Sequence, residues 1–472
     1  MKFRDLKVEA SVIKGKNAYM LQIKDNLSQL VNNLHYNTTL IMVRAMNLFK
    51  SHTAGRLQFF LFTLILFSPF HEEVCIGQEA DKSSLPLGKW RNERLEFDTR
   101  PFDNSLLGHG LLNQSYFDFK NNLWSDNGIS FGGYISANVQ WGSHPGPAHG
   151  ISETLLMITW EMLRNPNSSG RLVVGFAHDQ TFGHPTTREF ANDQQIVETP
   201  NDLDTDPEMT FTTLGLFHWE QEWRIESDRG FGLRAGQLYA PSYFGSARYL
   251  DDDRRFFMAR PIAAAAGAQW VGYNDIGLGM NAIAWKSPWY ASVAVMDGKA
   301  NRQFFDIESI FDGELLYLAE IGFENNVDGP NESAIRITFT HLDVKDGNSP
   351  SHGPGQSLMV SGDIRFEGMW AIAGRWSKSY KRLSADYEEL LSLGIMWLMP
   401  FNRDQDLAGF GFFAGDPSDE IRGLEYGGEF FYRLQLTNAF RVLPDIQYWI
   451  RKDESSEKIT TWIWGIRSEF EF

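Results

Sequence analysis

The sequence has little cysteine, few basic residues and only one long apolar run, and each shortage excludes a class of protein. One Cys among 472 residues excludes a disulfide scaffold and any site built from several cysteine ligands. The only long unbroken apolar run covers residues 57–70, whereas a bundle of membrane-spanning helices needs several runs of roughly 20 apolar residues. Because 43 Lys and Arg face 60 Asp and Glu, the net charge of −17 argues against nucleic acid as a partner.

The abundant residues favour strands and turns. Aromatic residues make up 14% of the chain, with 15 Trp, and 42 Gly stand against 18 Pro. Aromatic side chains are enriched in strands, and Gly supplies the turns between them. This composition predicts an all-β protein rather than a helical enzyme.

The apolar run at residues 57–70 has the features of a secretory signal. Basic residues precede it, and Cys75 and Gly77 follow at the spacing of a cleavage site. The run is too short to cross a membrane comfortably as a helix, although an uncleaved anchor is the alternative. We expect translation to start at Met46, with Met42 as the alternative. This predicts four regions: an extension (1–45), a signal peptide (46–77), an amino-terminal periplasmic or plug segment (78–122) and the main domain (123–472).

Apolar and polar residues alternate along much of the main domain. Near the carboxyl end, for example, Trp462, Trp464 and Ile466 alternate with polar residues. Such alternation predicts strands with one apolar and one polar face. The runs that show it are 129–141, 217–225, 231–239, 335–341, 364–372, 424–436, 440–450 and 461–472. Residues 391–401 are apolar at nearly every position, so their faces stay unassigned.

The segments between these runs are of two lengths. Short turns are expected at 227–230 and 436–439, and long polar loops at 179–209, 343–358, 376–388 and 402–422. Short turns that alternate with long loops are typical of a transmembrane β-barrel. A soluble sandwich, with its apolar face inside, is the competing architecture.

Two further features favour the barrel. The polar face around Asp363, Arg365 and Glu367 carries both charge signs, which suits a channel lining. Aromatic residues near the strand ends suit a girdle at the membrane interface; they are Tyr426, Tyr432, Tyr448 and Trp462.

Three stretches resemble the carbohydrate-selective porins of Gram-negative outer membranes, the OprB family. They are Leu-Trp-Ser-Asp-Asn-Gly-Ile-Ser-Phe (123–131), the segment 231–244, and the hairpin 430–451 with Tyr-Arg-Leu-Gln-Leu-Thr and Leu-Pro-Asp-Ile-Gln-Tyr. The first is similar to the family's opening strand. The resemblance implies a transmembrane antiparallel β-barrel of about sixteen strands in the outer membrane. It also implies passive diffusion of glucose-like sugars into the periplasm, and a role for the terminal Phe472 as a signal to the barrel-assembly machinery.

A sugar channel needs hydrogen-bond donors and acceptors around a constriction, and arginine and glutamate supply them. The mixture of charge signs on the polar faces argues against a phosphate-type anion pore. The candidates for lining the channel and binding sugar are Glu220, Glu222, Arg224, Arg234, Arg336, Arg365, Glu367, Arg375, Glu429 and Arg433.

No catalytic residue, metal site or cofactor is expected. Ser130 fits the pattern G-x-S-x-G, but it lies in a predicted strand rather than in a strand-to-helix turn. The acidic run at residues 202–208 lacks the spacing of an EF-hand. The expected partners are a mono- or oligosaccharide, membrane lipid and the assembly machinery, with a homo-oligomer left open. The alternatives are a general or differently selective porin, an outer-membrane enzyme or export barrel, and a secreted soluble sugar-binding protein.

Overall fold

The computed structural model describes thirteen segments of the chain, all of them after residue 105. The described residues are 106–107, 112–182, 185–201, 210–251, 255–264, 276–298, 308–325, 331–343, 355–380, 386–403, 405–419, 422–453 and 457–472. The predicted extension, the signal peptide and most of the segment 78–122 lie outside them. Among the described residues, no helix is long and apolar enough to cross a membrane.

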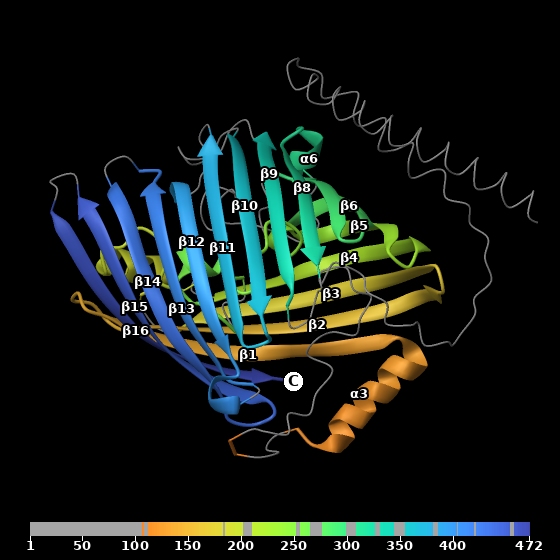
Figure 1. Cartoon of the computed structure of the whole chain (residues 1–472), viewed down its shortest axis with the longest axis horizontal. Helices are drawn as coiled ribbons and strands as arrows, with labels where there is room; N and C mark the ends of the chain where they lie inside the picture. Colours follow the sequence, from red (N-terminus) through yellow and green to blue (C-terminus); the bar gives the residue numbers. More distant parts are fainter. Residues whose placement is uncertain are drawn as a thin grey trace, which may run out of the picture. The chain divides into compact units, whose positions relative to one another are not determined.

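Sixteen antiparallel strands form a closed barrel in which each strand pairs with its neighbours in sequence, and β1 pairs with β16 (Figure 1). The strands are β1 (Ile129–Gly142), β2 (His149–Asn165), β3 (Ser168–Thr181), β4 (Thr210–Glu226), β5 (Arg229–Tyr239), β6 (Ile276–Lys286), β7 (Trp289–Asp297), β8 (Leu315–Asn325), β9 (Ser333–Asp343), β10 (Gly355–Phe366), β11 (Trp370–Tyr380), β12 (Tyr387–Leu398), β13 (Leu407–Pro417), β14 (Arg422–Gln435), β15 (Phe440–Asp453) and β16 (Lys458–Glu471). The predicted fold class and strand number are confirmed.

The two faces of each strand differ as the alternation predicts. On β9, Ile335 and Ile337 are each 51% exposed, whereas Arg336 between them is only 6% exposed. The apolar residues therefore point outward and the charged residue points inward. A soluble sandwich would show the opposite arrangement, so the faces define a transmembrane barrel.

Aromatic pairs on the outer face join neighbouring strands. The rings of Tyr448 and Trp462 lie 4.5 Å apart, and those of Trp370 and Trp397 are stacked at 5.7 Å. Tyr448 and Trp462 are among the predicted girdle residues. Such pairs stabilise a sheet and suit the boundary between lipid and water.

The two ends of the barrel have connections of different length. At the short-turn end, five of the seven connections have two to four residues, namely 166–167, 227–228, 287–288, 367–369 and 436–439, and two are longer, namely 326–332 and 399–406. The opposite, long-loop end carries 182–209, 240–275 and 298–314. Phe472 lies at the short-turn end, where its backbone N–H donates to the carbonyl of Gly133 (2.9 Å) and helps to close the ring.

Two predictions from the pattern are wrong. Residues 364–372 do not form one strand, because a turn at 367–369 separates β10 from β11. Residues 402–422 are not a loop, because they contain β13. The glycines of β13 resemble turn residues in the sequence, but they leave room for inward aromatic rings: a Cβ on Gly409 would lie 2.2 Å from Cε1 of Phe431.

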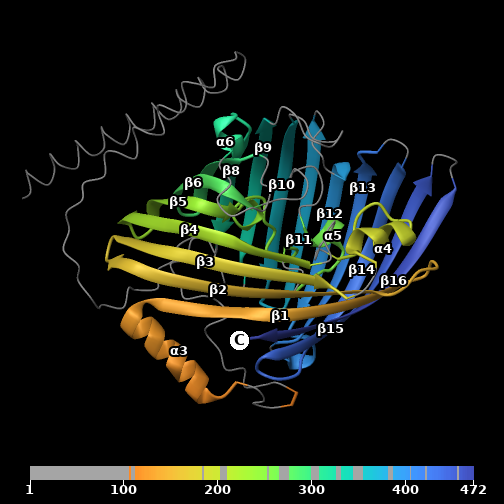
Figure 2. The ribbon, with the colours of Figure 1, turned by 180° about the vertical axis from the view of Figure 1, so that it is seen from behind.

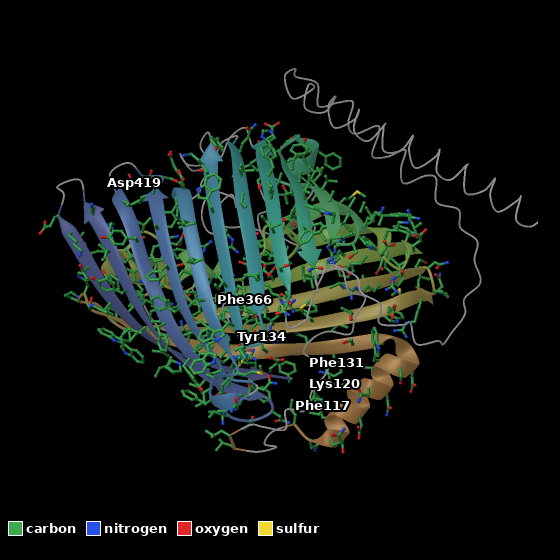
Figure 3. All side chains as sticks on the ribbon, in the orientation of Figure 1. Phe117, Lys120, Phe131, Tyr134, Phe366 and Asp419 are labelled. Atoms are coloured by element: carbon green, nitrogen blue, oxygen red, sulfur yellow. The ribbon has the colours of Figure 1, made fainter. Side chains whose placement is uncertain are left out.

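The amino-terminal end of the barrel begins with a helix. Residues 123–127, which resemble part of an opening strand, belong instead to α3 (Gln114–Asn127), and β1 starts only at Ile129. Figure 3 shows Lys120 and Phe131 where α3 meets β1. The Lys120 ammonium nitrogen lies 4.8 Å from the centre of the Phe131 ring, a cation–π contact that helps to hold the helix against the barrel.

Candidate channel constriction

Two connections at the long-loop end fold into the barrel. Inner loop A consists of residues 185–201 between β3 and β4 and contains α4 (Thr187–Asp193). Inner loop B consists of residues 240–251 and 255–264 between β5 and β6 and contains η3 (Ala240–Ser242) and α5 (Arg260–Ala263). Figure 2 shows α4 and α5 within the ring of strands. Apolar residues of both loops form one buried cluster with inward residues of β11 to β16.

Inner loop B fits against glycines of the wall. Phe257 is fully buried, and its ring packs edge-on against Phe431 at 5.1 Å between centres. A Cβ on Gly394 would lie 2.7 Å from the Phe257 ring, and one on Gly411 would lie 2.8 Å from it. The close approach therefore requires glycine at both positions.

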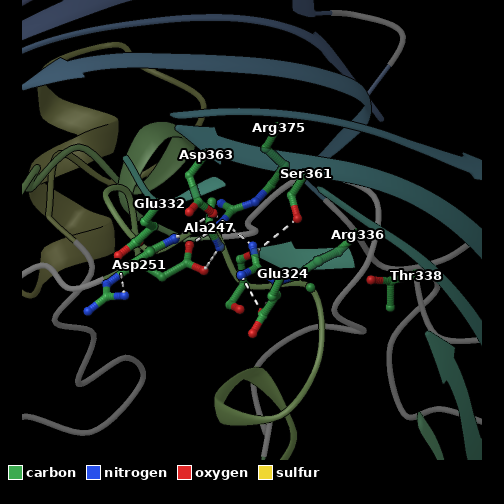
Figure 4. A network of polar contacts seen from close by, with 12 residues as sticks. Ala247, Asp251, Glu324, Glu332, Arg336, Thr338, Ser361, Asp363 and Arg375 are labelled. Atoms are coloured by element: carbon green, nitrogen blue, oxygen red, sulfur yellow. Dashed lines mark hydrogen bonds and ion pairs between the residues drawn. The ribbon is translucent and has the colours of Figure 1, made fainter. Parts of the chain in front are cut away.

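Ion pairs fix the start of inner loop B to β8, β9 and β10. The Arg336 guanidinium donates to Glu324 (2.6 Å), to Asp363 (2.8 Å) and to the backbone carbonyl of Ser246 (3.1 Å). The Ser361 hydroxyl donates to the same carbonyl at 2.9 Å. Figure 4 shows Arg336 with these partners. Because all three charged side chains are buried, the network holds the loop rigidly to the wall.

Further contacts continue around the wall toward β16. Arg375 on β11 forms an ion pair with Asp251 of inner loop B. The Glu429 carboxylate accepts hydrogen bonds from the backbone N–H groups of Met258 (2.8 Å) and Ala259 (2.7 Å). Arg467 donates to the Phe256 carbonyl at 2.9 Å. Charged wall residues thus satisfy the backbone of a loop that would otherwise be buried without partners.

Inner loop A is held by β1, β14 and β15, which overlap with the part of the wall that inner loop B contacts. The side-chain amides of Gln140 and Gln447 both donate to the Pro200 carbonyl, at 3.0 and 2.8 Å. The Val197 N–H donates to Glu425 at 2.9 Å. These contacts join the loop to β1, β14 and β15, so both inner loops narrow the lumen.

A second charged cluster lies on β3, β4 and β5. Glu220 forms ion pairs with Arg234 (2.6 Å) and Arg171 (2.5 Å). The guanidinium carbon of Arg234 lies 4.0 Å from the centre of the Tyr243 ring in inner loop B, and the Tyr243 hydroxyl lies 3.3 Å from His218. The planar stack orients the guanidinium while the carboxylate neutralises it.

Inner loop A meets the connection before β12 at a pair of carboxyl groups, and inner loop B adds an arginine there. Glu198 of inner loop A and Asp386, which precedes β12, are hydrogen-bonded to each other, so one proton is shared. Arg260 (3.5 Å) and Arg188 (3.4 Å) lie beside Glu198. Burial opposes ionisation of Glu198, but the two arginines and its hydrogen bonds lower its pKa to about 2. Burial and then the charge of Glu198 raise the pKa of Asp386 well above its usual range.

This pair predicts a pH dependence. Between the ordinary Asp pKa of 3.8 and its raised value, folded Asp386 holds a proton that the unfolded chain has lost. Its contribution to stability therefore falls as the pH rises through that window. Asp386→Asn keeps a hydrogen-bond donor beside Glu198 at every pH. Hydrogen-exchange protection of residues 185–201 should fall as the pH rises above 3.8 in the wild type and stay nearly constant in the variant. An equal fall in both proteins would contradict this assignment.

The structure places the predicted channel residues in three groups. Six are buried on the inner face, where most anchor inner loop B or pair with one another: Glu220, Glu222, Arg234, Arg336, Arg375 and Glu429. Three are half-buried on the inner face toward the short-turn end: Arg224, Arg365 and Arg433. Glu367 is exposed in the turn between β10 and β11, so its expected place on a strand face is wrong.

Other residues at the constriction come from the inner loops, which the sequence pattern did not single out. Arg188, Arg248 and Arg260 each pair with a buried carboxylate and remain 22–41% exposed. They lie in irregular or short helical segments, where no period distinguishes an inward residue from an outward one. Their only signal in the sequence is the unusual length of the two connections.

The remaining candidates do not form a chemical site. Residues 202–208 lie outside the described part of the chain. Within the described part, no group of three His, Cys, Asp or Glu residues could hold a metal ion. Ser130 is fully buried in β1, and the following residues continue the strand rather than starting a helix, so the pattern around it is not a nucleophile elbow.

A closed ring of sixteen antiparallel strands narrowed by inward loops is the architecture of a porin. Residues 367–472 match the family model described as "Carbohydrate-selective porin, OprB family", which confirms the resemblance over the carboxyl-terminal part. Similar solved structures include Pseudomonas putida OprB at low pH (11% identity, 76% of this chain, 98% of the other, TM-score 0.48) and a mutant Rh. blastica porin (11%, 73%, 100%, 0.41). No curated protein matches the chain.

Proposed function

We propose that this protein is an outer-membrane porin through which saccharides of about glucose size diffuse passively into the periplasm. One observation carries the proposal: the barrel interior is narrowed by two loops, one held to the wall by arginine and carboxylate groups and the other by glutamine amides and a carboxylate. Sugar hydroxyls need such donors and acceptors in exchange for their bonds to water. The match of residues 367–472 to a family of carbohydrate-selective porins supports the same substrate class.

Six of the ten predicted residues have a role in this proposal. Arg336, Arg375 and Glu429 hold inner loop B directly. Arg234 contacts Tyr243 of the same loop and is paired with Glu220, so these five residues fix the width of the constriction. The half-buried Arg224, together with Arg248 and Arg260 of the inner loop, contacts the passing sugar. Phe472 serves as the assembly signal, and the apolar outer face contacts membrane lipid. No catalysis is part of the proposal.

Liposome swelling tests the transport step. The full chain, purified from an outer membrane in detergent, is reconstituted into vesicles that are placed in isosmotic sugar. We expect fast swelling in glucose and slower swelling in di- and trisaccharides, because the inner loops limit the width. Empty vesicles treated with the same detergent are the control. Equal rates for all sugars would indicate a general porin, and no swelling would contradict the proposed function.

A further inference from the structure

In several ion pairs inside the barrel, the arginine side chain is more exposed than the carboxylate that it contacts. Arg248 is 41% exposed, whereas its partner Glu332 is 4% exposed. Arg260 is 22% exposed and lies beside Glu198, whose side chain is fully buried. In both pairs the carboxylate is covered by protein and the guanidinium faces the water of the lumen. The sequence shows only that the predicted channel residues carry both charge signs, but the accessible surface of these pairs is cationic.

The arginine is also more exposed than its carboxylate partner near both ends of the barrel lumen. Arg188 (27% exposed) joins Arg260 near Asp386, at the long-loop end where β12 begins. Toward the short-turn end, Arg224 is 27% exposed and its partner Glu222 is 2% exposed. Residues two apart on a strand share a face, so Arg224 points inward with Glu222. A solute crossing the barrel therefore meets exposed guanidinium groups at entry and at exit.

Acidic groups inside the barrel are also accessible, among them Glu189 and Asp193 of inner loop A. Asp251 is 25% exposed beside the buried Arg375, and Asp386 is 36% exposed beside Arg188. In the pairs of Arg248 with Glu332, Arg260 with Glu198 and Arg224 with Glu222, however, the guanidinium is the exposed partner and the carboxylate is buried. The accessible surface of these three pairs is therefore cationic.

From this asymmetry we infer that, among saccharides, the channel favours those that carry a carboxylate, such as hexuronates. The inference rests on the proposed function and names its substrate class. A guanidinium presents a planar fork of donors that matches a carboxylate with two parallel hydrogen bonds. A neutral sugar of the same size receives only single, weaker bonds. Exposed cations also raise the local concentration of anions in a narrow lumen.

Planar bilayers separate this inference from the proposed function. The full chain is studied at pH 7 with two measurements: the reversal potential in a KCl gradient, and channel block by glucuronate or glucose. We expect anion selectivity and block by glucuronate at a concentration roughly tenfold lower than for glucose, which is the scale of one charge-assisted hydrogen bond. Channels that glucose and glucuronate block equally, or that select cations, would overturn the inference while the porin function stands.

Variants of Arg248 and Arg260 test whether these two residues cause the preference for glucuronate. Arg248→Gln with Arg260→Gln should lower the preference for glucuronate severalfold and reduce anion selectivity. The corresponding lysine variants should keep anion selectivity, because the charge remains, but should lose part of the preference because the fork is gone. Arg229→Gln is the matched control: Arg229 pairs with exposed Glu226 at the turn between β4 and β5. An equal loss in the control and in the double variant would contradict the assignment, and channels unaffected by any sugar would refute the proposed function itself.

Discussion

Replacing Arg336 with methionine should raise the single-channel conductance roughly twofold and weaken the block by sugar, because inner loop B loses its main attachment. Arg336 bridges Glu324 and Asp363 and also donates to the Ser246 carbonyl. All three charged groups are almost fully buried, so solvent does not screen the change. Removing one partner of a buried ion pair costs about 3–5 kcal/mol, since the remaining charge is left uncompensated.

A graded series of variants tests that explanation. Ser361→Ala removes only the single 2.9 Å hydrogen bond to the Ser246 carbonyl, so the conductance should change little. A triple variant that adds Glu324→Gln and Asp363→Asn to Arg336→Met removes the uncompensated charges. It should assemble better than the single variant and still conduct more than the wild type. Wild-type conductance in a well-assembled triple variant would show that the network does not position the loop.

Gly394→Val should displace inner loop B by disrupting its apolar contact with β12. A Cβ at this position would lie 2.6 Å from Leu250 and 2.7 Å from Phe257, both in inner loop B. Overfilling a packed contact of this kind costs about 1–3 kcal/mol. Because the clash is with the loop rather than with neighbouring strands, we expect the barrel to assemble, with a higher conductance and less exclusion of large sugars.

Gly374→Val is the matched control for this change. Gly374 lies on the neighbouring strand β11, and its added Cβ would meet Leu393 at 3.5 Å, an ordinary contact. A β-branched residue suits an outward strand position. The control should therefore conduct like the wild type. The comparison between the two variants isolates the loop, and an unchanged conductance in Gly394→Val would contradict the packing described for Phe257.

The barrel could be predicted from the sequence because its strands obey one simple period. Residues 335–340 of β9 alternate without interruption, and in β15 only Leu443 and Trp449 are apolar residues on the inner face, so inward and outward faces were assigned correctly. The failures have local causes. At residues 364–372 the turn uses Glu367 and Gly368 at positive φ without the usual cluster of turn residues. Around Gly215 the register of β4 shifts, which exchanges odd and even inward positions within one strand.

The constriction was less predictable for a different reason. The alternation shows that Glu429 points inward, but it does not show whether its carboxylate contacts water, a sugar or a backbone N–H group. Only the three-dimensional path of inner loop B shows that Glu429 accepts from Met258 and Ala259. Conversely, the exposed arginines lie in the loops, where no alternation marks them. Charge counting could not show which partner of each ion pair is buried.

Single-channel recording with added sugar tests the central claim most directly. The full chain is inserted into a planar bilayer, and glucose and glucuronate are titrated on one side. The account predicts a small conductance that falls in a saturable manner with sugar concentration, because a narrow lumen lined by guanidinium groups binds the solute. A large conductance that no sugar reduces would contradict a constriction that recognises saccharides, and the absence of channels would contradict the porin itself.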